Sequence, residues 1–289
     1  MSEKLKPQIH EYLNYRIFLK DMYSFLKKSS PGFSYRNFSR AAGLRSSNFL
    51  KLVMDGKRNL GTENIHRFAK ALKLTREENH FFEVLVHFAQ ASSAEEKNLY
   101  YDRIARSKKY TDIRPLEVQQ YAYFSHWHFV ALRELVSLQN FQEDPGWINR
   151  KLRLKLHPEE IKKAIRILLE LGLLERNAQG RLQQSVQKIT TTPEMGALTV
   201  VNFHREMIRK ASESLESSSA PQRNISALTI GISKRQFEKI RDRLDQFRRE
   251  IHAISSEEDP KECVYQLNLQ FFNLSEVPWN VSTPSTLKK

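Results

Sequence analysis

Apolar residues recur at helical spacing through most of residues 9–106, and this periodicity constrains the fold more than any other feature of the chain. The apolar stripe of a first helix comprises Tyr12, Ile17, Phe18, Met22 and Phe25, and the turn-forming SSPG at 29–32 ends this helix. Hydroxyl side chains also stand where helix N-caps are needed, at Ser34, Ser46, Thr62, Thr75 and Ser93. The pattern predicts a bundle of five or six short helices.

A strong positive charge narrows the choice of partners. The 289 residues include 47 Lys and Arg against 33 Asp and Glu, which gives a formal net charge of +14. A surface of that charge attracts polyanions, so we expect nucleic acid as a partner ahead of an anionic membrane.

Cysteine and hydropathy patterns limit cofactors and location. One cysteine, Cys263, excludes an internal disulfide and any site built from several thiolates. The stretch MSEKLKPQIHEYL lacks the apolar core of a secretory signal, and no run is long and apolar enough to span a membrane. We therefore expect a cytoplasmic protein with no metal, no cofactor and no membrane contact.

Composition and period divide the chain into three expected domains, 1–106, 107–192 and 193–289. The polar segment SKKYTDIRP (107–115) forms the first boundary. A long helix over 116–138, two shorter helices beginning near Pro145 and Pro158, and a hairpin turning at 177–180 then follow the order of a winged helix.

In the last domain the spacing of apolar residues changes from helical to alternating. Apolar and polar residues alternate over 228–232 and again over 265–271, and a helix from Ser233 to about Ile254 lies between them. The predicted fold class is mainly α with a small α/β part: an N-terminal helix-turn-helix bundle, a central winged helix and a C-terminal two-stranded α/β domain for dimerisation or sensing.

Residues 38–60, FSRAAGLRSSNFLKLVMDGKRNL, have the features of a helix-turn-helix. Ser39 is a small residue on the first helix, and Gly43 supplies a turn residue free to take a positive φ. With Phe49 and Leu52 facing the core, a second helix near 46–55 turns its polar edge outward.

That polar edge is the predicted reading surface. Short polar side chains at the start of such a helix reach base edges in the major groove. We expect base contacts from Arg45, Ser46, Ser47, Asn48 and Lys51, and phosphate contacts from Arg36, Arg40, Lys57 and Arg58.

A second basic surface is expected on the central domain. It comprises Lys162, Lys163, Arg166, Arg176 and Arg181. Glu159, Glu160 and Glu170 dilute it, and winged helices also serve as dimer or connector modules, so its contact with DNA stays open.

Residues 34–60 followed by TENIHRFAKALKL (62–74) resemble the lambda-repressor or Xre type of helix-turn-helix. That resemblance implies a five-helix domain that binds DNA as a dimer. The wider chain, through NYRIFLKDMYSFLKK, YFSHWHFVALREL, LTVVNFHREM and VYQLNLQFF, is similar to a bacterial family of presumed regulators whose C-terminal domain has unknown function.

The sequence therefore predicts a dimeric transcriptional regulator that binds double-stranded DNA, with a possible effector or partner protein. Two alternatives remain open: a protein-interaction adaptor that keeps the scaffold without binding DNA, and an RNA-binding protein. We do not expect an enzyme, because no acid, base and nucleophile form a recognisable set in the sequence.

Overall fold

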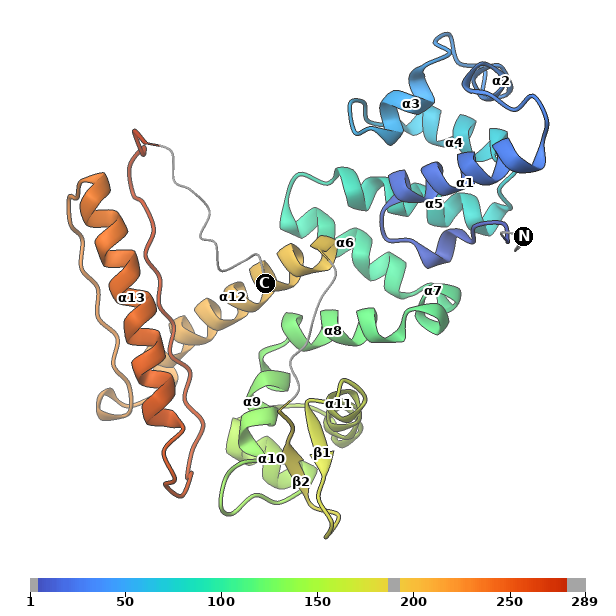
Figure 1. Cartoon of the computed structure of the whole chain (residues 1–289). Helices are drawn as coiled ribbons and strands as arrows, with labels where there is room; N and C mark the ends of the chain where they lie inside the picture. Colours follow the sequence, from blue (N-terminus) through green and yellow to red (C-terminus); the bar gives the residue numbers. More distant parts are fainter. Residues whose placement is uncertain (1–4, 187–192, 280–289) are drawn as a thin grey trace.

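A computed structural model describes residues 5–186 and 193–279 as a mainly helical chain with one two-stranded antiparallel sheet (Figure 1). The elements in chain order are η1 (Ile9–Glu11), α1 (Tyr15–Ser29), α2 (Tyr35–Ala41), α3 (Phe49–Met54), α4 (Thr62–Ala71), α5 (Arg76–Gln90), α6 (Ala94–Ala105), α7 (Lys108–Ile113), α8 (Pro115–Ser125), α9 (Trp127–Leu135), α10 (Pro145–Leu152), α11 (Pro158–Glu170), β1 (Leu174–Arg176), β2 (Leu182–Gln184), α12 (Pro193–Ser217), η2 (Ala220–Gln222) and α13 (Lys234–Ser255). The prediction of a mainly helical fold is confirmed. Residues 1–4, 187–192 and 280–289 lie outside the described part of the chain, and so do the predictions that fall on them.

Helix caps account for most of the helix starts in residues 9–106. The predicted caps that accept a backbone N–H at the start of a helix are Ser34 for α2, Thr75 for α5 and Ser93 for α6. Two predicted caps were wrong. Ser46 lies in the turn before α3, which begins after Asn48, and Thr62 is itself the first residue of α4.

The first core joins the N-terminal helices to α12. Phe82 of α5 is fully buried in this core, and its ring centroid lies 6.2 Å from those of Tyr15 and Phe18 of α1. Met195 and Leu198, at the start of α12, are buried in the same core although they follow α5 by about a hundred residues. Helix α12 thus packs against the N-terminal helices before it extends toward α13 (Figure 1).

A second core lies between α9, α10, α11 and the hairpin. Asp144 caps α10 by accepting from the Trp147 N–H at 2.6 Å, and His157 caps α11. The predicted hairpin is confirmed: β1 and β2 pair antiparallel, and Gly180 takes φ +76° in the turn while its N–H donates to Asn177. This core buries one face of α11 and leaves the opposite face to solvent.

The predicted helix over 116–138 is interrupted, which is a correction. His126 has extended backbone (φ −133°, ψ 114°), and it separates α8 from α9. The break reorients the chain so that Phe129 and Leu132 enter the second core. It also brings the rings of His126 and His128 to 5.7 Å, and burial lowers the pKa of His128 to about 4, so this side chain is neutral at pH 7.

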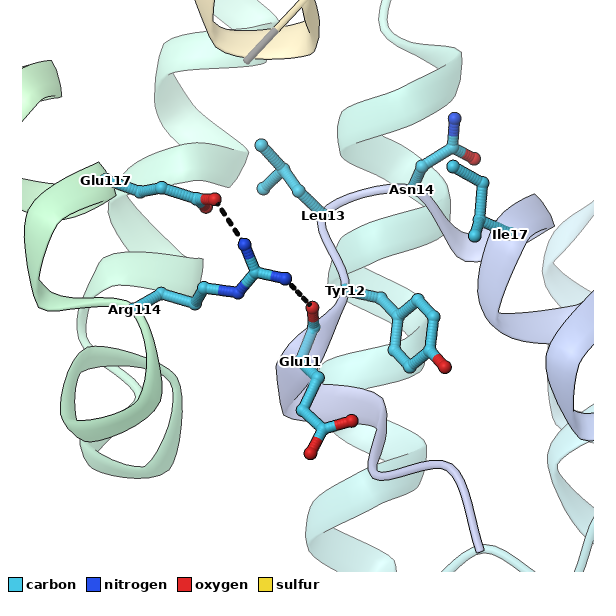
Figure 2. A pocket seen from close by; sticks show the side chains of 7 residues that line it. All are labelled: Glu11, Tyr12, Leu13, Asn14, Ile17, Arg114 and Glu117. Carbon is cyan, nitrogen blue, oxygen red and sulfur yellow. Dashed lines mark hydrogen bonds and ion pairs between the residues drawn. The ribbon is translucent and has the colours of Figure 1, made fainter. Parts of the chain in front are cut away.

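An ionic bridge ties the N-terminal segment to α8 (Figure 2). The Arg114 guanidinium donates to Glu117 Oε1 at 2.7 Å and to the Glu11 carbonyl at 2.6 Å, and the Tyr110 hydroxyl donates to the other Glu117 oxygen at 2.7 Å. These groups border a pocket of about 330 Å³ that is lined by Glu11, Tyr12, Leu13, Asn14, Ile17, Arg114 and Glu117. Because Arg114 and Tyr110 donate to both carboxylate oxygens of Glu117, the burial of this charge is explained by its role in holding the N-terminal segment against α8.

Within the described residues 193–279 the predicted C-terminal two-stranded sheet does not form, which corrects the predicted α/β domain. Residues 228–232 and 265–271 are extended, but they run along opposite sides of α13 and are not paired with each other (Figure 1). Alternation predicts an extended segment with one apolar face; a strand also needs a neighbour, which the alternation does not specify. Across 5–186 and 193–279, no helix has the length and apolar character required to cross a membrane.

Candidate nucleic-acid interface

Helices α2 and α3 are joined by a tight turn at Gly43. Gly43 has φ +63°, a conformation that glycine adopts without steric cost. The Leu44 N–H donates to the Ser39 carbonyl at 2.8 Å and closes the turn. The turn residue predicted from sequence therefore occupies the backbone conformation for which glycine is needed.

Ser39 fixes the start of α3 in a way that the sequence did not reveal. Its side chain is only 3% exposed, and its hydroxyl donates to the Ser46 carbonyl at 3.0 Å. On the other side of the turn, Arg67 of α4 donates to the Gly43 carbonyl at 3.1 Å and pairs with Glu63 at 2.6 Å. These bonds satisfy turn carbonyls and orient the segment before α3.

The inner face of α3 differs in detail from the prediction. Leu50, Val53 and Met54 are buried, whereas Phe49 is half-buried against Phe68, with ring centroids 5.9 Å apart. Leu52, which we expected to face the core with Phe49, is half-exposed. The buried face is therefore formed by Leu50, Val53 and Met54 instead of Phe49 and Leu52, and the helix is still supported from behind.

All five predicted base-contacting residues are exposed. Arg45, Ser46, Ser47 and Asn48 lie in the turn that leads into α3, and Lys51 lies on the helix. No later part of the described chain covers them, because α2 and α3 lie at the end of the molecule away from α8–α13 (Figure 1). The structure thus leaves this edge open to a partner.

The predicted phosphate-contacting residues surround the same edge. Arg36 and Arg40 lie on α2, Lys57 and Arg58 lie in the loop after α3, and all four are exposed. We call the six cations of this region the basic face: Arg36, Arg40, Arg45, Lys51, Lys57 and Arg58. None of the six forms an ion pair within the described part of the chain, and Asp55 is the one acidic residue of the sequence from 35 to 61. The positive potential of this face is therefore not neutralised internally.

Two long-range anchors hold the loop that carries Lys57 and Arg58. Arg16 of α1 donates to the Val53 carbonyl, to the Arg58 carbonyl at 2.9 Å and to Asn59 Oδ1 at 2.7 Å. Gln90 of α5 exchanges two hydrogen bonds with the Leu60 backbone, at 2.8 and 2.9 Å. Sequence reasoning missed both anchors because their partners are 30 or more residues away and no local pattern marks them.

Substitution of Gly43 tests whether the turn needs its left-handed backbone. A Cβ at Gly43 would meet nothing within 4 Å, so Gly43→Ala adds backbone strain alone, and we expect the free energy of unfolding to fall by about 1–2 kcal/mol. Gly231→Ala is the matched control, since Gly231 lies outside the left-handed φ region and has the same free space, and we expect no loss of stability. Chemical denaturation followed by circular dichroism measures both; equal effects would contradict this account of the turn.

The second predicted basic surface is weaker. Lys162, Lys163 and Arg166 are exposed on α11, but Lys162 pairs with Glu159 at 2.8 Å. On the hairpin, both terminal nitrogens of Arg176 bind the Glu143 carboxylate, at 2.8 and 3.0 Å. Two of the five cations are thus paired with carboxylates, and Lys163, Arg166 and Arg181 remain without an ion pair among the described residues.

Comparison of the chain with curated proteins and with solved structures finds no match. A family model does match, over residues 107–274, which is more than half of the 289 residues; its description is domain of unknown function (DUF4423). The matched region starts after α6, so it excludes the basic face and includes α7 through α13. The chain belongs to the DUF4423 family.

Proposed function

We propose that this protein is a dimeric transcriptional regulator whose N-terminal helix-turn-helix binds double-stranded DNA. The observation that carries the proposal is the basic face: six exposed cations without ion pairs in the described residues surround a helix that is buried only from behind. A surface of this kind suits the phosphate backbone, which supplies most of the affinity in sequence-independent binding.

The dimensions of α3 suit the major groove. An α-helix with its side chains is about 10–12 Å across, which matches the width of the major groove, about 12 Å. In this pose Arg36, Arg40, Lys57 and Arg58 bind phosphates on either side, while Ser47, Asn48 and Lys51 meet base edges. Ser39 and Arg67 act indirectly, by orienting the turn.

The central region has the element order of a winged helix: α10, α11 and the β1–β2 hairpin. We propose that it connects or dimerises rather than supplies the main DNA contact, because Glu143 and Glu159 occupy two of its five predicted cations. A dimer follows from energetics, since one head makes few phosphate contacts and two linked heads combine their binding energies.

The proposal is tested by fluorescence anisotropy of the full chain with labelled duplex DNA, single-stranded DNA and an RNA hairpin, each over a range of salt. We expect duplex to bind best, with log affinity falling linearly against log salt. Preference for the RNA hairpin would replace the proposal with RNA binding. Absence of salt-dependent binding to any of the three would favour a protein-interaction adaptor.

A further inference from the structure

Residues 264–272 form an extended edge without backbone–backbone hydrogen bonds in the described chain; the Gln266 side chain donates to the Leu267 carbonyl at 3.1 Å, and the Asn268 side chain donates to the Met207 carbonyl of α12 at 2.8 Å. No residue of 224–232 or 264–272 takes part in a backbone–backbone hydrogen bond within the described chain. Apolar side chains of this edge are also open, with Tyr265 72% exposed and Phe272 71% exposed. An extended segment with most of its backbone groups unpaired and several apolar side chains exposed pairs readily with another strand.

The same two segments lack the features that protect free edges. In a chain with 28% charged residues, neither 224–233 nor 263–275 contains a charge or a proline. Exposed edges in monomeric proteins normally carry lysine, proline or a bulge that blocks pairing. Because these segments contain neither lysine nor proline, we expect their edge to be covered by a binding partner. The lack of charge argues against nucleic acid or an anionic membrane as that partner.

The sequence of this edge identifies the occupant. Residues 265–271 read Tyr-Gln-Leu-Asn-Leu-Gln-Phe, an aromatic, Gln, Leu, Asn, Leu, Gln, aromatic series that is symmetric about Asn268. Antiparallel pairing of this segment with itself, around a two-fold axis through Asn268, places Leu267 opposite Leu269, Gln266 opposite Gln270 and Tyr265 opposite Phe271. A second copy of the chain therefore offers a matching edge at every position, as an isologous interface requires.

We propose that residues 264–272 pair antiparallel with the same segment of a second copy, centred on Asn268, and form a two-stranded sheet shared between two protomers. Helix α13 covers part of its apolar face, with Phe237 and Phe271 stacked at 5.4 Å between ring centroids. The helix has no buried residue, although apolar side chains recur along it at spacings of three and four: Phe237, Ile240, Leu244, Phe247, Ile251 and Ile254. The strand of the second copy would add apolar surface next to this stripe.

A symmetric disulfide tests the pairing and its register. In the Cys263→Ser background of the full chain, Asn268→Cys places two thiols opposite each other, about 4.5–5.5 Å apart at Cα, within the range that a disulfide bridges. We expect mild oxidation to convert most of this variant to a covalent dimer on a non-reducing gel. Asn273→Cys in the same background is the control, because its own copy lies about 34 Å away, and it should stay monomeric on the gel.

The proposed register also predicts a crosslink that involves the native Cys263, which is exposed. Pairing centred on Asn268 sets Cys263 opposite Asn273 of the second copy, so Asn273→Cys in the otherwise native chain should also crosslink. Light scattering in solution supplies the independent measurement: we expect a dimer for the native chain and a monomer with unchanged circular dichroism for Leu267→Lys/Leu269→Lys. A native monomer, or a dimer that does not crosslink at position 268, overturns the proposal.

This inference deepens the dimer of the proposed function, but its readouts are separate from DNA binding. A chain that forms the covalent dimer but does not bind duplex DNA would contradict the proposed regulator function and support the proposed interface. A chain that binds duplex DNA but does not crosslink at position 268 would support the regulator function and contradict the interface.

Discussion

Charge reversal of Lys57 and Arg58 to glutamate lowers affinity for every duplex sequence by about 100-fold at 0.1 M salt, for each head that contacts DNA. Each phosphate contact contributes about 0.9 to the slope of log affinity against log salt, so losing two contacts flattens that slope by about 1.8. Fluorescence anisotropy at several salt concentrations measures both quantities.

The structure makes this pair a clean target. Both side chains are exposed and lie in no ion pair among the described residues, while the loop is held through backbone groups. The Lys57 and Arg58 N–H groups donate to the Leu52 carbonyl, and Arg16 donates to the Arg58 carbonyl. Substitution of the two side chains therefore leaves the loop in place.

Lys234→Glu/Arg235→Glu is the matched control, because it changes net charge by the same amount at the exposed start of α13. We expect a much smaller loss of affinity and an unchanged salt slope. Equal losses for the two pairs would mean that net charge, rather than the basic face, accounts for binding.

Truncation of Phe68 to alanine removes the support behind both helices of the reading surface. Phe68 is fully buried on α4, and its ring lies 5.0 Å from Phe38 of α2 and 5.9 Å from Phe49 of α3, measured between centroids. Deleting a buried phenylalanine costs about 3–5 kcal/mol, and we expect a loss of that size in the free energy of unfolding. Denaturation followed by circular dichroism measures it.

Phe68→Leu serves as the control for volume, since it keeps an apolar side chain in the site and should lose clearly less stability. At temperatures where the Phe68→Ala chain is still folded, duplex affinity should fall as well, because α3 loses its position. A stability loss below about 1 kcal/mol would show that these rings do not brace the surface.

Local patterns predicted the elements that local chemistry determines. The caps at Thr75 and Ser93, the turn at Gly43 and the hairpin turn ending at Gly180 were all predictable, because each depends on residues within a few positions. Exposure of the predicted cations was predictable for the same reason, since helical spacing separates inner from outer faces.

The features of the fold and of the candidate site that the sequence did not predict depend on contacts between residues far apart in the chain. The Ser39 bond to Ser46 and the Arg16 bonds to the loop set where α3 begins and how its loop is held. The break at His126 changes the direction of the chain, so that Phe129 and Leu132 of α9 join Tyr123 of α8 in the second core. For 265–271, alternation predicted extended backbone but could not say that the neighbouring strand is missing from this chain.

Selection of bound sequences from a random duplex library tests the central claim most directly. The claim is that the exposed edge of the turn and α3 reads base pairs. The account predicts that the native chain enriches a defined motif with two half-sites, and that Lys51→Ala changes the preferred base at one position of each half-site while retaining binding. A folded native chain that enriches no motif, or an unchanged motif with Lys51→Ala and with Ser47→Ala, would contradict it.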